Sequence, residues 1–453
     1  MRRLLVALLL LGLATSQLAS ADPIAGPQRV VEQASADTAA ACRRDLPATD
    51  EQCNAVPLSP AVTAQRLSDY LKSETHRGLA QQFALGNDVP FRHAAWLGTH
   101  NSFNTTARMA TLSGLDSNQQ LSMTDQLRSD MRSVELDAHW FPSLQAGGLA
   151  PVLCHAEGED KKHAGCTTEP LLIDGLREVG AWLKANPGQV VLLYLENHLE
   201  TDEGYAAGAA AVRTALGPML YAPGGSACSP LPLSRTRNDV LRAHKQVVII
   251  SGCHSGAGWN GVIYSGEARA KDETGPAGYG DKGSCDAARP PARFDDHLLR
   301  VFEDSTAVTA TSEQGANRIG AGKARALQQC AVDITGFDQL LSGDARLTSS
   351  VWSWAPHQPA AGGCAVQQGD GWHTAPCNAR HAFACRTTRG WSVDTRAATA
   401  SARGRCKGGQ VGTPRYGWEA VQLRAAMARA HVTAAWISLT SSGTRWTAHD
   451  RPS

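Results

Sequence analysis

The segment VVLLYLENH, residues 190–198, is the stretch of sequence from which the fold of this chain can be inferred. An uninterrupted apolar run gives way at its end to Glu196, Asn197 and His198. A short apolar run of this kind predicts a strand that is buried on both faces, as the strands of parallel sheets are. The end of this strand then carries polar groups.

Four other runs share this texture: AAWLGTH (94–100), SVELDAHW (133–140), PVLCHAEG (151–158) and QVVIISGC (246–253). Helical spacing of apolar residues occurs in GLREVGAWLKAN (175–186), GYAAGAAAVRTALGPML (204–220) and FDDHLLRVFED (294–304). Two later segments are strand candidates, AVDITGF (331–337) and SSVWSWAP (349–356). Strands that alternate with helices predict an α/β fold with a parallel sheet covered on both sides. The length of residues 90–356 suits a TIM-type (β/α)8 barrel, and an open doubly wound sheet is the alternative.

Polar side chains at the ends of the strand-like runs favour the barrel. They are His100 and Asn101, Glu135 and Asp137, His155, and Glu196. In a barrel, the carboxyl ends of successive strands converge on one mouth, where catalytic groups lie. We therefore expect these side chains to meet although they are far apart in sequence.

The Glu-x-Asp pair on one strand places Glu135 and Asp137 on the same face, because strand side chains alternate. Two carboxylates held together inside a barrel are costly without a cation. With Glu196 and the amide oxygen of Asn101, they form a hard oxygen-donor set that suits Ca²⁺, with Mg²⁺ as the alternative. The imidazoles of His100 and His155 are then available for proton transfer.

These residues resemble the X-region catalytic barrel of calcium-dependent phosphoinositide-specific phospholipases C. The matching pieces are THNSFN, VELDAHW, the Cys-His of PVLCHAEG, and VVLLYLENH. Their order and rough spacing match the family over residues 90–356, most closely in secreted bacterial and fungal members. Metal-independent relatives carry Asp-x-Arg where this chain has Glu-x-Asp, so the calcium-dependent version is the better match.

The resemblance implies a role for each matching residue. The Ca²⁺ ligands would be the side chains of Asn101, Glu135, Asp137 and Glu196. His155 would be the general acid on the diacylglycerol oxygen, and His100 would stabilise the pentacoordinate phosphate. The base for the inositol 2-hydroxyl would be a calcium-bound carboxylate or His100.

The expected substrate is phosphatidylinositol at a membrane surface, or a glycosylated form of it. No pleckstrin-like, EF-hand or C2-like region is evident, nor a basic set for polyphosphoinositides. Lys245 is a substrate-binding candidate that could instead flank a strand. Trp352 and Trp354 are candidates for stacking on the inositol ring, although strand tryptophans are as often core residues.

Two other functions are alternatives to the cleavage of phosphatidylinositol. A glycerophosphodiester phosphodiesterase on the same barrel usually begins with His-Arg-Gly, where this chain has His-Asn-Ser. A secreted binding protein could act through the C-terminal tail on a decayed barrel, but the complete set of six polar residues argues against decay. The net charge of +1 and the absence of a basic run argue against nucleic-acid binding.

The N-terminal sequence predicts a secreted or periplasmic protein. Residues 1–21 combine a basic start, a short apolar run and a small-residue cleavage site, as signal peptides do. A transmembrane anchor is the alternative, but the apolar run is too short to span a bilayer, and no later segment reads as membrane-spanning. Residues 22–89 are interpreted as a leader with ragged helical spacing from residue 60 to 82, lying against the main domain.

Twelve cysteines fit an oxidising compartment and a disulfide framework. The short-loop candidates are Cys42–Cys53 and Cys154–Cys166. Residues 357–453 resemble the two halves of a C-type lectin-like domain in reversed order, which implies the bridges Cys364–Cys377 and Cys385–Cys406. A disulfide-clipped extension of the barrel is the alternative, and the oligomeric state is left open.

Overall fold

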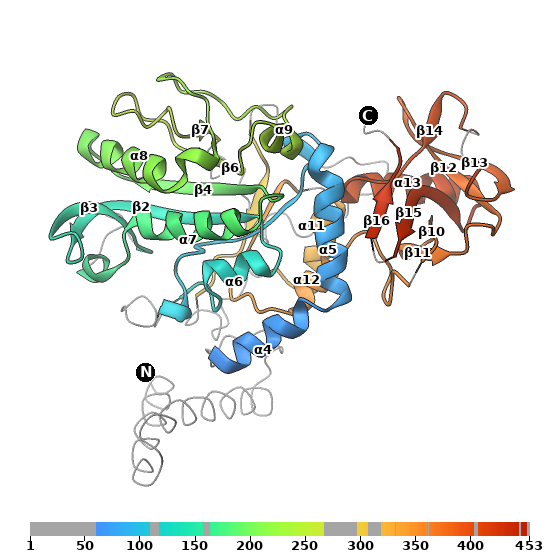
Figure 1. The fold of residues 1–453 in the computed structure, drawn as a ribbon, viewed down its shortest axis with the longest axis horizontal. Helices are drawn as coiled ribbons and strands as arrows, with labels where there is room; N and C mark the ends of the chain where they lie inside the picture. The colour runs from blue at the N-terminus through green and yellow to red at the C-terminus, as the bar shows by residue number, and fades with distance from the viewer. Residues whose placement is uncertain are drawn as a thin grey trace, which may run out of the picture.

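Two β-sheets follow one another along the chain, and helices lie between them (Figure 1). The computed structural model describes residues 60–108, 117–156, 164–266, 297–306, 319–330, 332–360, 362–402, 406–443 and 445–450. The predicted signal peptide, residues 22–59 of the predicted leader, and the predicted Cys42–Cys53 bridge lie outside these residues.

The first sheet has the strand order β5-β6-β4-β2-β1-β9-β8, with β3 paired to β2 and β7 to β6. Its strands are β1 (Trp96–Thr99), β2 (Ser133–Ser143), β3 (Gly148–Leu153), β4 (Val191–His198), β5 (Leu220–Tyr221), β6 (Val247–Ser251), β7 (Tyr264–Ser265), β8 (Arg300–Phe302) and β9 (Ile334–Phe337). The helices of this part are α4 (Pro60–Tyr70), α5 (Glu74–Leu85), α6 (Met123–Arg128), α7 (Leu172–Ala185), α8 (Asp202–Leu216), α9 (Arg237–Arg242), α11 (Ala321–Gln329) and α12 (Ala345–Ser349). Every pairing is parallel except that of β2 with β3. The predicted α/β class and its parallel sheet are confirmed.

The sheet curls into a half-barrel. Trp96 on β1, Tyr264 on β7 and Ile334 on β9 share one buried apolar cluster, although β7 and β9 belong to opposite arms of the sheet. Residues so far apart in the strand order meet only when the sheet bends around them. In the described segments β7 and β8 do not pair with each other, so closure into a (β/α)8 barrel stays a prediction.

Side chains on β2 alternate between the two faces of the curled sheet. Val134 and Leu136 pack outward into the cluster that contains residues of α7 and α8. The intervening residues Glu135 and Asp137 therefore point inward, as the two-residue period of a strand requires. The same alternation places Glu196, near the end of β4, on the inner face of the curled sheet.

The segment 294–304 was expected to be a helix, and this prediction is wrong for its described part. Residues Arg300–Phe302 form β8, which pairs in parallel with β9 through Arg300 and Ile334. Val301 and Leu299 enter the cluster beneath α11. A short run with many apolar residues fits both periodicities, and the tertiary pairing with β9 decides for the strand.

The segment 349–356 was expected to be the last strand of the barrel, and the structure corrects this also. It forms no strand of the parallel sheet. Instead Trp372 N donates to Ser353 O at 2.8 Å, and Ala355 N donates to Trp372 O at 3.1 Å. These bonds attach the segment to the second sheet, so the parallel sheet ends at β9.

Helices α4 and α5, which precede β1 in the chain, pack against the parallel sheet. The ragged apolar spacing predicted helix here, and Leu67, Tyr70 and Leu79 pack in a cluster with Leu97 and Phe337. The chain bends between the two helices at Ser73, whose side chain accepts a hydrogen bond from the His76 N–H and caps α5.

The second sheet has the order β11-β10-β15-β12-β13, with β14 on β12 and β16 on β15. Its elements are β10 (Cys364–Gln367), β11 (Trp372–Ala375), β12 (His381–Thr387), β13 (Gly390–Ala398), β14 (Gly409–Val411), α13 (Gly417–Arg429), β15 (Ala435–Ser442) and β16 (Arg445–Ala448). Its pairings are antiparallel apart from that of β12 with β15. The likeness to C-type lectins stays a prediction.

Disulfides clip both parts of the chain. The predicted bridges Cys154–Cys166, Cys364–Cys377 and Cys385–Cys406 are confirmed. A further bridge, Cys228–Cys253, was not predicted from the sequence. None of the described helices combines the length and apolar composition needed to cross a bilayer.

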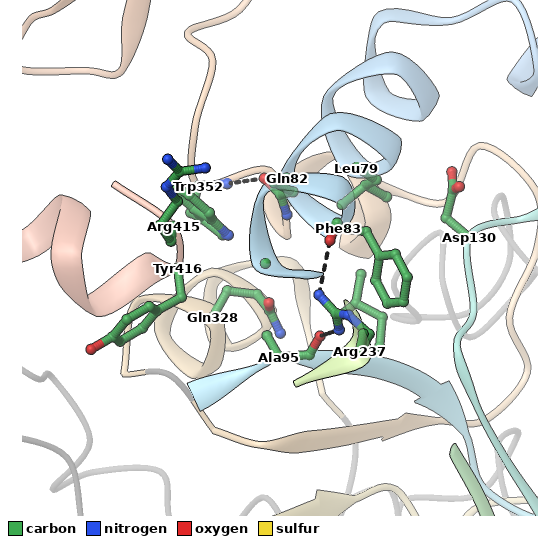
Figure 2. A pocket seen from close by; sticks show the side chains of 12 residues that line it. Leu79, Gln82, Phe83, Ala95, Asp130, Arg237, Gln328, Trp352, Arg415 and Tyr416 are labelled. Carbon is green, nitrogen blue, oxygen red and sulfur yellow. Dashed lines mark hydrogen bonds between the residues drawn. The ribbon is translucent and has the colours of Figure 1, made fainter. Parts of the chain in front are cut away.

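Helix α5 lies between the two sheets (Figure 1). One of its side chains bonds to the segment that connects them. Gln82 Nε2 donates to Ser350 O at 2.9 Å, while Gln82 Oε1 accepts from Trp352 N at 3.2 Å and from Ser353 Oγ at 3.1 Å. Figure 2 shows Gln82 and Trp352 at the edge of a cavity of ≈ 30 Å³. This volume holds no more than a few water molecules, so the cavity is not a substrate site.

The opposite side of this cavity carries a buried guanidinium group (Figure 2). Arg237 lies 3.6 Å from the ring centroid of Phe83 and donates to Phe83 O at 2.8 Å. Burial, and then the charge of Arg132, lower the pKa of Arg237 to about 9. The cation is held by an aromatic face and by backbone carbonyls, which is a structural role.

Candidate functional site

Three carboxylates meet on the inner face of the curled sheet. The register of β2 with β4 sets Asp137 opposite Glu196, and Glu135 opposite Tyr194. One oxygen from each of Glu135, Asp137 and Glu196 lies within 4.8 Å of the others. The sheet thus brings together the carboxylates that the sequence predicted to meet.

The chain turns sharply where β1 ends, and this turn supplies the fourth donor. Asn101 has a φ of 44°, a left-handed conformation that asparagine tolerates better than most residues. Ser102 N donates to Glu135 O at 3.0 Å, which ties the turn to β2. One end of the side-chain amide of Asn101 faces the two carboxylate oxygens of Asp137 at 2.8 and 3.2 Å, and it donates to them when its NH₂ group occupies that end.

His100 is held by a carboxylate that the sequence did not identify. His100 Nδ1 lies 3.1 Å from Asp338 Oδ2, and both side chains are buried. Asp338 directly follows β9, so it occupies the same kind of strand end as the other site residues. Ser305 N donates to Asp338 Oδ2 at 2.7 Å, and Gln119 Nε2 to Asp338 Oδ1 at 3.0 Å.

This pairing changes the protonation of both groups. Burial alone would lower the pKa of His100, but the charges of Asp338 and Glu135 together raise it to about 10. Burial raises the pKa of Asp338 to about 7, against the opposing effect of His100. The arrangement favours a charged imidazolium facing the acidic cluster, with its Nδ1 committed to Asp338.

A buried arginine enters the same cluster from β8. The guanidinium of Arg300 donates through Nη2 to Glu135 Oε2, and both side chains are only 4% exposed. The guanidinium carbon of Arg300 also lies 4.3 Å from the ring centroid of Tyr194 and 4.2 Å from that of Phe302. Arg300 was not predicted as a site residue, because its segment was taken for a helix.

The charges in the cluster favour a divalent cation. Burial, followed by the charges of Glu196 and Glu135, raises the pKa of Asp137 well above its ordinary range. Arg300 neutralises one of the three carboxylates, which leaves an excess of two negative charges. Three carboxylates and an amide oxygen are hard donors, so the residues present fit one calcium ion.

His155 follows a strand whose direction differs from the one predicted. The segment 151–158 was expected to be a parallel strand, but β3 runs antiparallel to β2, with Ala138 opposite Leu153. The carboxyl end of β3 therefore lies beside Asp137 of β2, where Cys154 N donates to Asp137 O at 3.3 Å. This return brings residue 155 to the level of Asp137, and the Cys154–Cys166 bridge anchors it there.

Two more histidines extend the inner face beyond the carboxylates. His139 and His198 are directly opposite in the β2–β4 register, and their rings stack with centroids 4.5 Å apart. His198 Nε2 lies 2.9 Å from Glu196 Oε1, so it orients one predicted metal ligand. Both residues lie within the quoted runs VELDAHW and VVLLYLENH, two residues beyond the carboxylates and hence on the same face of the strand.

The three predicted substrate-binding residues lie elsewhere. Lys245 precedes β6, at the end opposite the strand ends that carry the site, and donates to Pro218 O at 3.0 Å. Trp352 and Trp354 are buried in the cluster of the second sheet, each in an edge-to-face contact with Trp372. The structure does not bring these residues to the carboxylates.

Comparisons with known proteins assign the chain to a family. A family model described as the Rv2075c PI-PLC-like domain matches residues 55–344. Two proteins of Mycobacterium tuberculosis described as uncharacterized, MT2135 (strain CDC 1551) and Rv2075c (strain H37Rv), are each 36% identical over 394 residues, covering 82% of this chain and 80% of theirs. The PI-PLC X domain-containing protein At5g67130 of Arabidopsis thaliana is 25% identical over 213 residues, 44% of this chain and 45% of that protein.

Solved structures give lower similarity. The phosphatidylinositol-specific phospholipase C of Staphylococcus aureus aligns over 58% of this chain and 94% of that chain, with 12% identity and a TM-score of 0.38. A calcium-dependent phosphoinositol-specific phospholipase C of Pseudomonas sp. aligns over 56% and 93%, with 14% identity and a TM-score of 0.33. The extent of the family model and the identity to the two mycobacterial proteins decide the assignment: the chain belongs to the family of the Rv2075c PI-PLC-like domain.

Proposed function

We propose that this protein is a calcium-dependent phosphodiesterase that cleaves phosphatidylinositol to diacylglycerol and inositol phosphate through a cyclic 1,2-phosphate. The observation that carries the proposal is the group of Glu135, Asp137 and Glu196 with the buried His100–Asp338 pair beside it. Family membership supports the reaction class. The PI-PLC X-domain name of the Arabidopsis relative points to the same substrate class.

Side chains of Asn101, Glu135, Asp137 and Glu196 would hold the cation. A bound Ca²⁺ would offset charge on the phosphate and lower the pKa of the attacking inositol 2-hydroxyl. In one orientation the Asn101 amide turns its oxygen toward the cluster, where it can bind the cation. In the other orientation its NH₂ group donates to Asp137.

Each proton transfer of the reaction is then assigned to a residue of the chain. His100 donates a hydrogen bond from Nε2 to a phosphoryl oxygen, because its Nδ1 is engaged by Asp338. A carboxylate of the cluster accepts the proton of the 2-hydroxyl, whose oxygen attacks phosphorus. His155 protonates the departing diacylglycerol oxygen, and the P–O bond to that oxygen breaks. To open the cyclic phosphate, neutral His155 takes a proton from water, and the 2-oxygen leaves with a proton from the carboxylate.

The disulfides support export to an oxidising compartment. Bridges persist in oxidising compartments and are rare in the cytosol, and the structure contains Cys154–Cys166 beside the site. We propose that the chain is exported, by the signal peptide predicted at residues 1–21, and that it acts on phosphatidylinositol at a membrane surface.

The test uses purified full-length protein and vesicles that contain phosphatidylinositol, with diacylglycerol and phosphorus-31 NMR as readouts. We expect diacylglycerol and a cyclic inositol phosphate to form with Ca²⁺, and formation to stop when chelator is added. Release of glycerol 3-phosphate from glycerophosphodiesters, without cleavage of phosphatidylinositol, would instead assign the glycerophosphodiesterase activity. No turnover of either substrate would favour a binding protein.

A further inference from the structure

A second hollow lies between the helices that flank the parallel sheet and the second sheet, away from the carboxylates. Its volume is ≈ 460 Å³, within the range of small-molecule sites. It is bordered by Arg325 of α11, Arg424 of α13, and the connecting segment with Trp354 and Pro356. We call it the α11–α13 groove. Both parts of the chain contribute to its wall, and Figure 1 shows α5, α11 and α12 beside the second sheet.

The acidic side chains in the groove are already engaged. Glu74 Oε2 accepts a hydrogen bond from His357 N at 3.1 Å and lies 3.8 Å from the ring nitrogen Nδ1 of the same histidine. Asp370 Oδ1 lies 2.7 Å from His373 Nε2. Each carboxylate therefore has a local histidine partner.

The two arginines are in the opposite situation. Neither Arg325 nor Arg424 has a hydrogen-bond or ion-pair partner in the part of the chain that the structure describes. Burial, and then the charge of Arg325, lower the pKa of Arg424. Arg325 is exposed and Arg424 is half-buried, whereas the buried arginines Arg300, Arg346 and Arg386 each pair with a carboxylate. Two guanidinium groups that line one groove, neither of them bonded to a carboxylate of the described segments, are available to bind an anion.

We propose that the α11–α13 groove binds a phosphate or sulfate group carried by a small molecule or by a lipid head group. Guanidinium groups bind such oxyanions by charge-assisted hydrogen bonds, often in pairs. Trp354 and Pro356 provide an apolar wall against which the attached carbon skeleton packs. The volume accommodates a ring or a short alcohol in addition to the anion. The groove is separate from the acidic cluster, so this inference does not depend on the proposed catalytic activity.

The test measures modification of single arginines by phenylglyoxal, followed by peptide mass spectrometry of the full-length protein. Chelator is present throughout, so that the acidic cluster holds no metal. The probes are inorganic phosphate, inositol 1-phosphate, and phosphatidylcholine vesicles with and without phosphatidylinositol. Arg429 is the matched control, because it is exposed on α13 but does not line the groove.

We expect a saturating probe to slow the modification of Arg325 and Arg424 about tenfold, which corresponds to one strong interaction at each arginine. The modification rate of Arg429 should not change. Protection by inorganic phosphate or inositol 1-phosphate assigns a soluble ligand, and protection only by phosphatidylinositol vesicles assigns a lipid head group. Equal modification with and without every probe, or equal protection of Arg429, overturns the proposal.

A variant makes the pairing itself falsifiable. Arg325 is exposed, so Arg325→Met is expected to fold, which circular dichroism verifies. It should weaken the protection of Arg424 by phosphate about tenfold, because one of two guanidinium groups is lost. Unchanged protection of Arg424 in a folded Arg325→Met protein would show that the two arginines do not bind one anion.

Discussion

Arg300 on β8 and Glu135 on β2 form a buried ion pair within the acidic cluster, although 165 residues separate them. The pair reduces three negative charges to an excess of two. An excess of two negative charges suits a divalent cation. Without Arg300 the excess would be three, which matches a trivalent cation. The arginine thus sets which cations the cluster accepts.

We therefore predict that Arg300→Met raises the preference for Tb³⁺ over Ca²⁺ at least about tenfold, because one extra negative charge a few ångströms away favours the higher charge. Displacement of Tb³⁺ by Ca²⁺, followed by terbium luminescence, measures the ratio of the two dissociation constants. Tyr194 lies close enough to the cluster to sensitise the signal.

The matched control is Arg386→Met, which removes the arginine of a buried pair with Glu419 in the second sheet. Both variants lose a buried partner and should unfold at lower temperature. Only Arg300→Met should change the ion preference. An identical Tb³⁺ to Ca²⁺ ratio in folded Arg300→Met would refute the charge-balance argument.

Asp338→Asn tests the carboxylate behind His100. The substitution keeps the shape but removes the charge, so the pKa of His100 should fall from its raised value of about 10. NMR titration of the imidazole measures this fall, and kcat should drop about 10²- to 10⁴-fold, as when a positioned acid or base is lost. A His100 pKa that does not move would show that Asp338 does not set its protonation.

His155→Ala tests the general acid with two substrates. Cleavage of phosphatidylinositol should slow about 10²- to 10⁴-fold, because the alkoxide of diacylglycerol leaves poorly without a proton. An inositol phosphodiester with a p-nitrophenyl leaving group needs no acid, so its cleavage should be nearly unaffected. Equal loss on both substrates would assign His155 to binding rather than to proton donation.

The bridge next to His155 gives a fourth prediction. Cys154→Ser combined with Cys166→Ser removes a bridge with a sequence separation of 12, which should cost about 2–4 kcal/mol of unfolding free energy. Activity should fall as well, since the bridge fixes the chain beside the acid. Denaturant unfolding and initial rates under non-reducing conditions measure both, and the serine pair at Cys228 and Cys253, bridged farther along the chain, is the comparison. Unchanged activity would separate the bridge from the site.

Much of the sheet could be predicted from sequence, and the reason is burial. The run at 190–198 contains an uninterrupted apolar stretch because both faces of β4 are covered, and the two-residue period then fixed the faces of Glu135 and Asp137. The two-residue period cannot reveal partners on distant strands. Asp338 lies 238 residues from His100, and only the pairing of β1 with β9 brings them together.

The errors also have physical causes. The residues of β8 satisfy a helical spacing as well as a strand spacing, and only the neighbouring β9 selects the strand. The tryptophans at 352 and 354 were expected at the mouth because their segment was taken for the last strand of the barrel. Their large apolar area instead packs in the cluster of the second sheet with Trp372, which lies later in the chain.

The three hydrogen bonds of Gln82 have a consequence for how the chain unfolds. One amide side chain on α5 bonds to Ser350, Trp352 and Ser353, where the chain leaves the first sheet for the second. A protein truncated after residue 356 would lose the second-sheet partners of that segment, and the buried amide would lose its fixed acceptors and donors. Removal of the C-terminal part should therefore weaken the first, and calorimetry of the intact chain should record one cooperative transition.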